Sequence, residues 1–138
     1  MREKLLVDAG PLIALFDKSD QYHDAALSCI AGLTEIPLTT WPVLTEVCHM
    51  LDFHINAQTG FLQWIINGGL EIAVLNHEDI LRISHLITKY ANVPMDLADA
   101  SLIVASEHLN TKRILSIDSD FQIFRNRYQE MLVNEFVR

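Results

Sequence analysis

The chain has little of several residue types, and each shortage excludes a class of protein. Its 138 residues include only two cysteines, Cys29 and Cys48, and these do not form a Cys-x-x-Cys pair. A disulfide framework or a thiolate zinc site needs more, so we interpret both as reduced, buried thiols. No apolar run approaches the roughly 18 residues that span a bilayer, and the first residues lead directly into a strand-like segment rather than a signal peptide. We therefore expect a cytoplasmic protein without a membrane segment.

Basic residues are also scarce. Ten lysines and arginines stand against 18 aspartates and glutamates, which gives a net charge of -8. Such a chain repels nucleic acid on average, although a bound cation can neutralise part of the acid. Four of the ten basic residues lie near the C-terminus and are candidate RNA phosphate contacts; the alternative is a solvated basic face. They are Lys112, Arg113, Arg125 and Arg127.

Half of the sequence is apolar and a fifth is charged, as in compact soluble proteins, and the length suits one domain, residues 1–138. Short apolar runs typical of buried strands alternate with segments of helical periodicity. This alternation predicts an α/β fold, a three-layer α/β/α arrangement with a largely parallel central sheet and helices on both faces. The expected strands are 4–7, 37–40, 70–75, 113–117 and 131–137, and the expected helices are 12–16, 20–32, 41–54, 56–67, 76–90 and 95–109.

Two of the expected strands end at a carboxylate. Asp8 directly follows the first strand, and Asp118 follows the strand at 113–117, with Asp120 two residues later. In open α/β sheets, ligands bind beyond the carboxyl ends of the strands, where the strand order reverses. Asp8 therefore stands where such a site would begin. The alternative for Asp8 is a helix N-cap, a position that Asp favours because it bonds free backbone N–H groups.

Two further acids lie at an expected helix start. Asp96 and Asp99 are three residues apart, so on a helix they would share one face. Burial of both without partners would be costly, and a divalent cation would remove that cost. Magnesium suits this setting because it prefers oxygen ligands, retains several waters and is commonly held by few carboxylates.

A carboxylate also lies early on the helix at 41–54. Glu46 is either solvated, where it would favour the helix dipole, or directed into a cleft. Together with Asp8, Asp99 and Asp118 it comes from two strand ends and two helix starts, as expected when distant segments converge at one end of a sheet. The histidines are scattered, so we expect them at the surface or in caps rather than in a zinc site.

Four segments together resemble the motifs of PIN-domain proteins, particularly the VapC-type toxins. They are 7–15, Glu46, 99–105 and 116–121, and they occur in the right order over essentially the whole chain. The resemblance implies a Mg²⁺- or Mn²⁺-dependent ribonuclease with a small α/β/α fold, often dimeric and commonly encoded with and bound by an antitoxin. It also implies the site residues: Asp8 and Asp99 as metal ligands, Glu46 as the acid between them and Asp118 as the fourth acid, with Asp96 and Asp120 as additional acids nearby.

From this resemblance we expect hydrolysis of RNA phosphodiester bonds by a metal-activated water, with one or two ions. Asp8, Asp99 and Asp118 would be metal ligands, and Glu46 a ligand or the residue that orients the water. One alternative is a phosphotransfer protein with Asp8 as phosphoacceptor, although no acid stands two residues after it. The other is a non-catalytic RNA- or protein-binding module of the same fold. No base-reading motif identifies the RNA.

Overall fold

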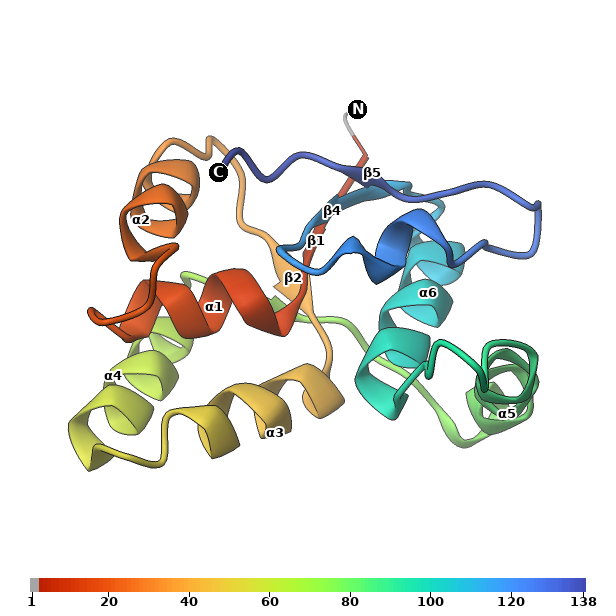
Figure 1. The fold of residues 1–138 in the computed structure, drawn as a ribbon, viewed down its shortest axis with the longest axis horizontal. Coiled ribbons are helices and arrows are strands. Elements are labelled where there is room, and N and C mark those ends of the chain that lie inside the picture. The colour runs from red at the N-terminus through yellow and green to blue at the C-terminus, as the bar shows by residue number, and fades with distance from the viewer. Residues whose placement is uncertain (1–2) are drawn as a thin grey trace.

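A computed structural model describes residues 3–138, in which a five-stranded sheet separates two groups of helices (Figure 1). All four pairs of neighbouring strands are parallel. The predicted α/β class with a parallel sheet is therefore confirmed; Met1 and Arg2, the first residues of the predicted domain, lie outside the described residues. The strands stand in the order β3 (Glu71–Ile72), β2 (Leu38–Thr39), β1 (Leu5–Val7), β4 (Arg113–Leu115) and β5 (Val133–Asn134).

The helices divide by their order in the chain. Figure 1 shows the first four on one side of the sheet and the last two on the other. None of the helices within residues 3–138 is long and apolar enough to cross a membrane. The α-helices are α1 (Ala9–Phe16), α2 (His23–Ala31), α3 (Trp41–Met50), α4 (Ile55–Ile66), α5 (Ile80–Lys89) and α6 (Leu97–Leu109), and the short 3₁₀ helices are η1 (His77–Asp79) and η2 (Ser119–Gln122).

The strand order reverses between β1 and β4. From β1 the chain moves outward through β2 to β3, and it then returns to the other side of β1 as β4. The register pairs Val7 with Leu115, so the residues that follow these two strands emerge at the same edge of the sheet. This edge is the topological switch point at which open α/β sheets bind their ligands.

Several element boundaries differ from the prediction. Helix α2 begins at His23 with Tyr22 at its N-cap, whereas Asp20 accepts the Tyr22 N–H at 2.8 Å in the preceding turn. Helix α3 ends at Met50, and His54 instead caps α4 by accepting the Asn56 N–H at 3.1 Å. Helical periodicity continues through such turns because their apolar side chains still face the core, so periodicity locates helices better than it locates their ends.

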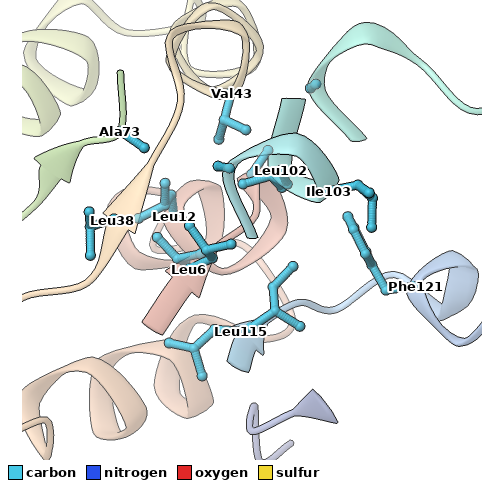
Figure 2. Packing of buried hydrophobic residues seen from close by; sticks show 14 of the residues in the cluster. Leu6, Leu12, Leu38, Val43, Ala73, Leu102, Ile103, Leu115 and Phe121 are labelled. Atoms are coloured by element: carbon cyan, nitrogen blue, oxygen red, sulfur yellow. The ribbon is translucent and has the colours of Figure 1, made fainter. Parts of the chain in front are cut away.

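The hydrophobic core is built around β1 and α6. Leu5, Leu6 and Val7 have no exposed surface, and residues 98–106 of α6 are buried without interruption. The small and apolar residues of this helix allow it to be buried nearly all round. Small residues on α6 allow it to pack against both α3 and α5. Figure 2 shows Leu102 of α6 among core side chains that include Leu6 of β1 and Val43 of α3.

Candidate active site

Asp8 is both a helix cap and a site residue. One carboxylate oxygen, Oδ1, accepts the Ala9 N–H at 2.8 Å and so caps α1. The other, Oδ2, lies 3.2 Å from the hydroxyl of Ser116, which follows β4. The residue is only 6% exposed. The N-cap alternative is therefore correct, and the cap itself holds the carboxylate at the switch point of the sheet.

Asp96 and Asp99 form a capping box rather than a pair on one helix face. Asp96 is the N-cap of α6, with extended backbone, and its Oδ1 accepts the Asp99 N–H at 2.8 Å. In return Asp99 Oδ2 accepts the Asp96 N–H at 3.2 Å. The prediction that both acids lie within the helix is wrong for Asp96, because Asp competes well for the cap position. Asp99 is 8% exposed, whereas Asp96 is exposed to solvent.

Ser116 connects the two strand ends that carry the acids. Its hydroxyl accepts the Asp118 N–H at 3.2 Å and lies within hydrogen-bonding distance of Asp8 Oδ2. Asp118 in turn caps η2 by accepting the Asp120 N–H at 2.9 Å. Sequence reasoning did not identify Ser116, although a polar residue inside the apolar run Ile114–Ile117 was the available signal.

The acids influence one another electrostatically. Burial, helped by the charges of Glu46 and Asp118, raises the pKa of Asp8 to about 7 against the hydrogen bonds from Ala9 and Ser116, which lower it. Burial likewise raises the pKa of Asp99 to about 8, helped by the charges of Asp96 and Asp8. Burial and the charges of Asp96 and Asp118 raise the pKa of Glu46. Burial and the charge of Asp118 also raise the pKa of Asp120. We call this group the acidic site; its members are Asp8, Glu46, Asp96, Asp99, Asp118 and Asp120.

The two buried members of the acidic site have no cationic partner in the described part of the chain. The ion pairs of residues 3–138 all lie elsewhere and involve neither Asp8 nor Asp99. Two desolvated carboxylates that repel each other are costly, and their oxygens are the donors that Mg²⁺ prefers. The donor chemistry therefore fits a divalent cation.

The three predicted carboxylate ligands do not by themselves form a complete metal site. Within residues 3–138, no group of three or more His, Cys, Asp or Glu side chains is arranged to hold a metal ion. Asp118 is exposed, in contrast to Asp8 and Asp99. Since Mg²⁺ is commonly held by one or two carboxylates together with water and substrate phosphate, Asp8 and Asp99 alone are a sufficient protein contribution.

A groove of about 590 Å³ adjoins the acidic site. It lies between α3 and the start of α6, and Glu46 and Asp96 belong to both the groove and the acidic site. Glu46 is thus exposed and at the same time directed into a cleft, so the two readings of this residue do not exclude each other. The remaining lining residues are Trp41, Pro42, Thr45, His49, Leu97 and Ala98.

Arg113 has an internal role. Its side chain is 9% exposed and forms ion pairs with Glu35 at 2.8 Å and Glu135 at 2.6 Å. The guanidinium also donates to the Glu3 carbonyl oxygen at 2.6 Å. It joins three chain segments at the start of β4, the end of the sheet opposite Asp118. We therefore do not retain Arg113 as an RNA contact.

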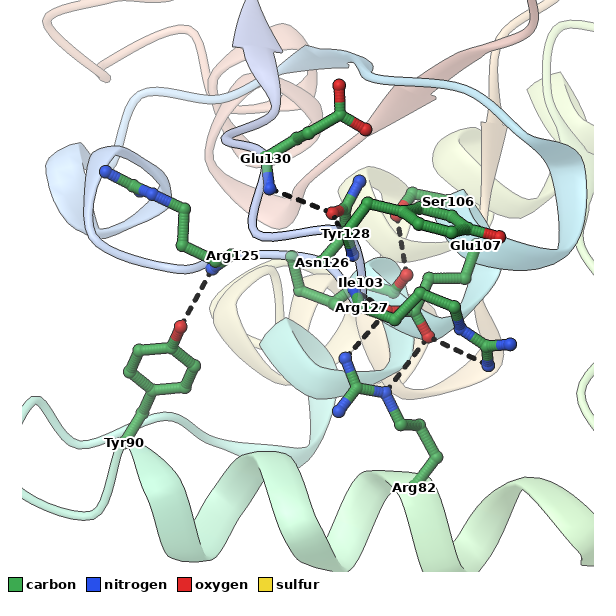
Figure 3. A network of polar contacts seen from close by, with 10 residues as sticks. All are labelled: Arg82, Tyr90, Ile103, Ser106, Glu107, Arg125, Asn126, Arg127, Tyr128 and Glu130. Carbon is green, nitrogen blue, oxygen red and sulfur yellow. Dashed lines mark hydrogen bonds and ion pairs between the residues drawn. The ribbon is translucent and has the colours of Figure 1, made fainter.

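Of the other three basic candidates, Lys112 and Arg127 also lie away from the acidic site. Lys112 precedes β4 and pairs with Glu130 at 2.9 Å. Arg127 reaches Glu107 near the end of α6, as Figure 3 shows, and its backbone N–H donates to Glu107 at 2.7 Å. Arg125 Nη1 lies 2.7 Å from the Gln122 carbonyl oxygen. Glu107 is eight residues beyond Asp99, or about 12 Å along a helix that rises about 1.5 Å per residue.

Comparison with known proteins agrees with this architecture. The PIN domain family profile matches residues 5–126. Ribonuclease VapC26 of Mycobacterium tuberculosis (strain ATCC 25618 / H37Rv) is 24% identical over 116 residues, which cover 83% of this chain and 86% of that protein. The crystal structure of Mycobacterium tuberculosis VapC20, described as a sarcin-ricin loop cleaving toxin, has the same fold, with a TM-score of 0.78 at 15% identity over 87% of this chain and 94% of that chain. The family match spans most of the sequence, so the resemblance drawn from its motifs is confirmed and the chain belongs to the PIN domain family.

Proposed function

We propose that the protein is a metal-dependent endoribonuclease and the toxin of a toxin–antitoxin pair. The observation that carries this proposal is the buried pair Asp8 and Asp99, which come from the end of β1 and the start of α6 and have no cationic partner within residues 3–138. Membership of the PIN domain family supports it, as does the name of the relative VapC26, a ribonuclease.

Asp8 and Asp99 would hold one Mg²⁺ or Mn²⁺, with Asp118 as a further ligand. When bound, such an ion lowers the pKa of its water and polarises the phosphoryl oxygen. The chain itself keeps the two ligands in place, because the Ala9 N–H fixes Asp8 and the Asp96 N–H fixes Asp99. Each ligand keeps an oxygen lone pair for the ion.

Glu46 orients the attacking water and accepts its proton. Burial and the neighbouring charges of Asp96 and Asp118 raise the pKa of Glu46 toward the range in which a carboxylate is an effective base. The side chain is exposed on the first turns of α3, so substrate can approach it. Lys112, Arg125 and Arg127 remain candidate contacts for RNA phosphates more distant from the cleaved bond.

The proposed partners are the RNA substrate, a cognate antitoxin protein and a second copy of the chain. Large apolar side chains are exposed on α3, α4 and the turn between them, and such surfaces favour protein association. The exposed residues are Met50, Phe53, Ile55, Leu62 and Ile66. Light scattering of the purified chain tests the dimer.

We place the activity in the cytoplasm, where RNA and an antitoxin would meet the toxin.

The test is cleavage of a mixed pool of cellular RNAs by the purified chain. We expect discrete fragments with Mg²⁺ or Mn²⁺, none with chelator, and a loss of roughly a thousand-fold or more in Asp99→Asn, since a catalytic metal is worth several kcal/mol. Asp52→Asn is the matched control, because Asp52 is exposed in the turn after α3 and carries the same chemical change. Fragments that persist in chelator or in Asp99→Asn would contradict the proposal.

The alternatives give different outcomes in the same experiment. A phosphoacceptor role for Asp8 would give labelling of the protein by phosphate rather than RNA fragments. A non-catalytic binding module would bind RNA or protein without releasing fragments under any condition. The buried, uncompensated carboxylates favour the nuclease over both.

A further inference from the structure

The groove beside the acidic site has features that metal binding does not explain. Trp41, Thr45 and His49 recur every four residues on α3, so they form one stripe that faces the start of α6. Trp41 is 69% exposed and Leu97, across the groove, is 54% exposed. Trp41 is therefore available to pack against a ligand.

The volume of the groove suits part of a ligand rather than solvent alone. About 590 Å³ lies within the range of small-molecule sites, roughly 300–1,000 Å³. The walls combine an aromatic ring and aliphatic side chains with a few polar groups, as in such sites. A planar, mostly apolar group that carries hydrogen-bonding edges fits this lining.

The charge of the groove disfavours phosphate as the group that occupies it. Its lining contains the carboxylates Glu46 and Asp96, and none of the described residues that line it is Lys or Arg. A nucleobase is uncharged, stacks on aromatic side chains and presents N–H donors at its edge. Carboxylates accept such donors, and the guanine edge offers two adjacent ones, N1–H and the N2 amino group.

The groove is also continuous with the acidic site. Glu46 and Asp96 line the groove, and their charges act on Asp8 and Asp99 respectively. A base bound in the groove would therefore belong to a nucleotide next to the bond that is cleaved. Asp96 uses Oδ1 for the Asp99 N–H, and its Oδ2 remains an acceptor for the base.

On the basis of the proposed nuclease activity, we propose that the groove is a base subsite for single-stranded RNA. One nucleobase stacks on Trp41 and directs its hydrogen-bond donors at Asp96, with guanine preferred, while Glu46 stays with the attacking water. The subsite selects the nucleotide beside the cleaved bond, whereas Asp8 and Asp99 act on the phosphate. Trp41 is thus the binding residue that touches the substrate, and Asp96 is the residue that selects the base.

The test measures binding rather than cleavage. In the Asp99→Asn background with Mg²⁺, the ligands are ten-residue uridine RNAs in which one central position is guanine, inosine, adenine or uracil. A fluorescein label at the end of each RNA reports binding by fluorescence anisotropy, also in variants that lack Trp41. Quenching of intrinsic tryptophan fluorescence is a second readout in the protein that keeps Trp41, because Trp41 is exposed whereas Trp64 packs on Phe16 at 5.6 Å between ring centroids. We expect quenching by the guanine RNA, and weaker binding of the inosine RNA, which lacks the N2 amino group.

Substitutions at Trp41 separate stacking from folding. Trp41→Ala should weaken binding of the guanine RNA roughly 5- to 100-fold, the range for loss of one base–aromatic stack, and Trp41→Phe should retain most of the affinity. Tyr128→Ala is the matched control, because Tyr128 is an aromatic residue, 66% exposed, outside the groove. Circular dichroism and thermal unfolding confirm that each variant is folded.

The outcomes distinguish the subsite from the nuclease. Unchanged affinity in Trp41→Ala, an equal loss in Tyr128→Ala, or equal affinity for the guanine and uracil RNAs would overturn the base subsite. RNA cleavage by the otherwise unaltered protein would still stand in that case. Conversely, Trp41-dependent binding of the guanine RNA without metal-dependent cleavage would support the subsite and contradict the nuclease.

Discussion

The two ends of α6 each carry an acid with little exposure, and the surroundings of the two acids are opposite. Near the end of the helix, Glu107 has a side chain only 2% exposed and accepts from Arg82 at 2.7 Å (Figure 3). Burial raises its pKa, but the bonds from Arg82 and Arg127 outweigh burial and hold that pKa below its usual range. At the start of the helix, burial raises the pKa of Asp99 to about 8, and its charged neighbours are all acids.

This difference separates an acid that is compensated within the protein from one that is not. Glu107 is satisfied within the protein and ties α5 and the segment after η2 to α6. The ionised form of Asp99 is left with an electrostatic cost that an external cation can remove. Residues 98–106 of α6 are buried and hold both acids in place, so the partners of each acid rather than the helix decide what it does.

Of the substitutions, loss of the satisfied acid should destabilise the protein most. Glu107→Gln removes the charge of a nearly buried side chain that pairs with Arg82 and with the more exposed Arg127, and we expect the free energy of unfolding to fall by about 3 kcal/mol. Urea unfolding followed by circular dichroism measures it. Glu130→Gln, at the exposed pair with Lys112, is the control and should change stability far less. Equal effects of the two substitutions would contradict the structural role of Glu107.

Addition of metal should stabilise the folded protein by binding at Asp99, the uncompensated acid at the start of α6. Mg²⁺ at about 100 times its dissociation constant should raise the free energy of unfolding by about 2.7 kcal/mol, because it binds the folded state alone. Asp99→Asn should abolish this increment. Glu107→Gln, although less stable, should keep it, and thermal unfolding with and without Mg²⁺ checks both. An increment that survives Asp99→Asn would place the metal elsewhere.

The metal-free protein should lose stability as pH rises. The folded-state pKa values of Asp8 and Asp99, about 7 and about 8, exceed the ordinary value of 3.8, so above pH 4 the folded state binds more protons than the unfolded state. Stability in chelator should therefore fall by several kcal/mol between pH 5 and pH 8, since each of the two carboxyls loses up to about 1.4 kcal/mol per pH unit below its folded-state pKa.

The same measurement on Asp99→Asn is its control. That variant should show a flatter decline in the free energy of unfolding over this pH range. Glu107 should contribute nothing to it, because its lowered pKa makes its stabilisation present above its ordinary value of 4.5 and lost only at lower pH. A stability in chelator that rises from pH 5 to pH 8 would show that the acidic site is already compensated.

A positive charge introduced at the acidic site should partly compensate its buried carboxylates, as the arginines compensate Glu107. Glu46→Lys replaces a charge that raises the pKa of Asp8 by one that lowers it. We expect a gain of about 0.5–1 kcal/mol in stability at pH 8 in chelator, the scale of an exposed ion pair, together with loss of cleavage. Thermal unfolding and the RNA assay measure the two effects, with Glu46→Gln as the neutral comparison.

The sequence predicted the features that depend on the order of neighbouring residues, namely the buried strands and the acids that follow them. The apolar runs at 4–7 and 113–117 predicted buried parallel strands because strands covered on both faces are continuously apolar. The carboxylates that follow them, Asp8 and Asp118, predicted a site because parallel strands end at one edge of a sheet. Asp96 was predicted within the first turn of the helix and is instead its N-cap. The three-residue spacing between Asp96 and Asp99 fits both positions, so the sequence does not distinguish them.

The sequence pattern did not predict which side chains contact one another in the folded protein. The basic residues near the C-terminus formed a cluster in the sequence, yet Arg113 pairs with Glu35, 78 residues earlier, inside the protein. Ser116 binds Asp8 across 108 residues. The groove exists only because α3 lies beside the start of α6. Each of these facts depends on which segments meet in space, and a single sequence carries no direct record of that.

The amino-acid sequence by itself determined the α/β class, the buried character of α6 and the acids that follow β1 and β4, because burial and capping are written in short-range patterns. Only the tertiary structure decided which buried acid is neutralised and which is not. Electrostatic compensation requires a charge within a few ångströms, and for Glu107 and Asp99 the nearest charges come from distant segments: arginines for Glu107, and for Asp99 the acid at the end of β1.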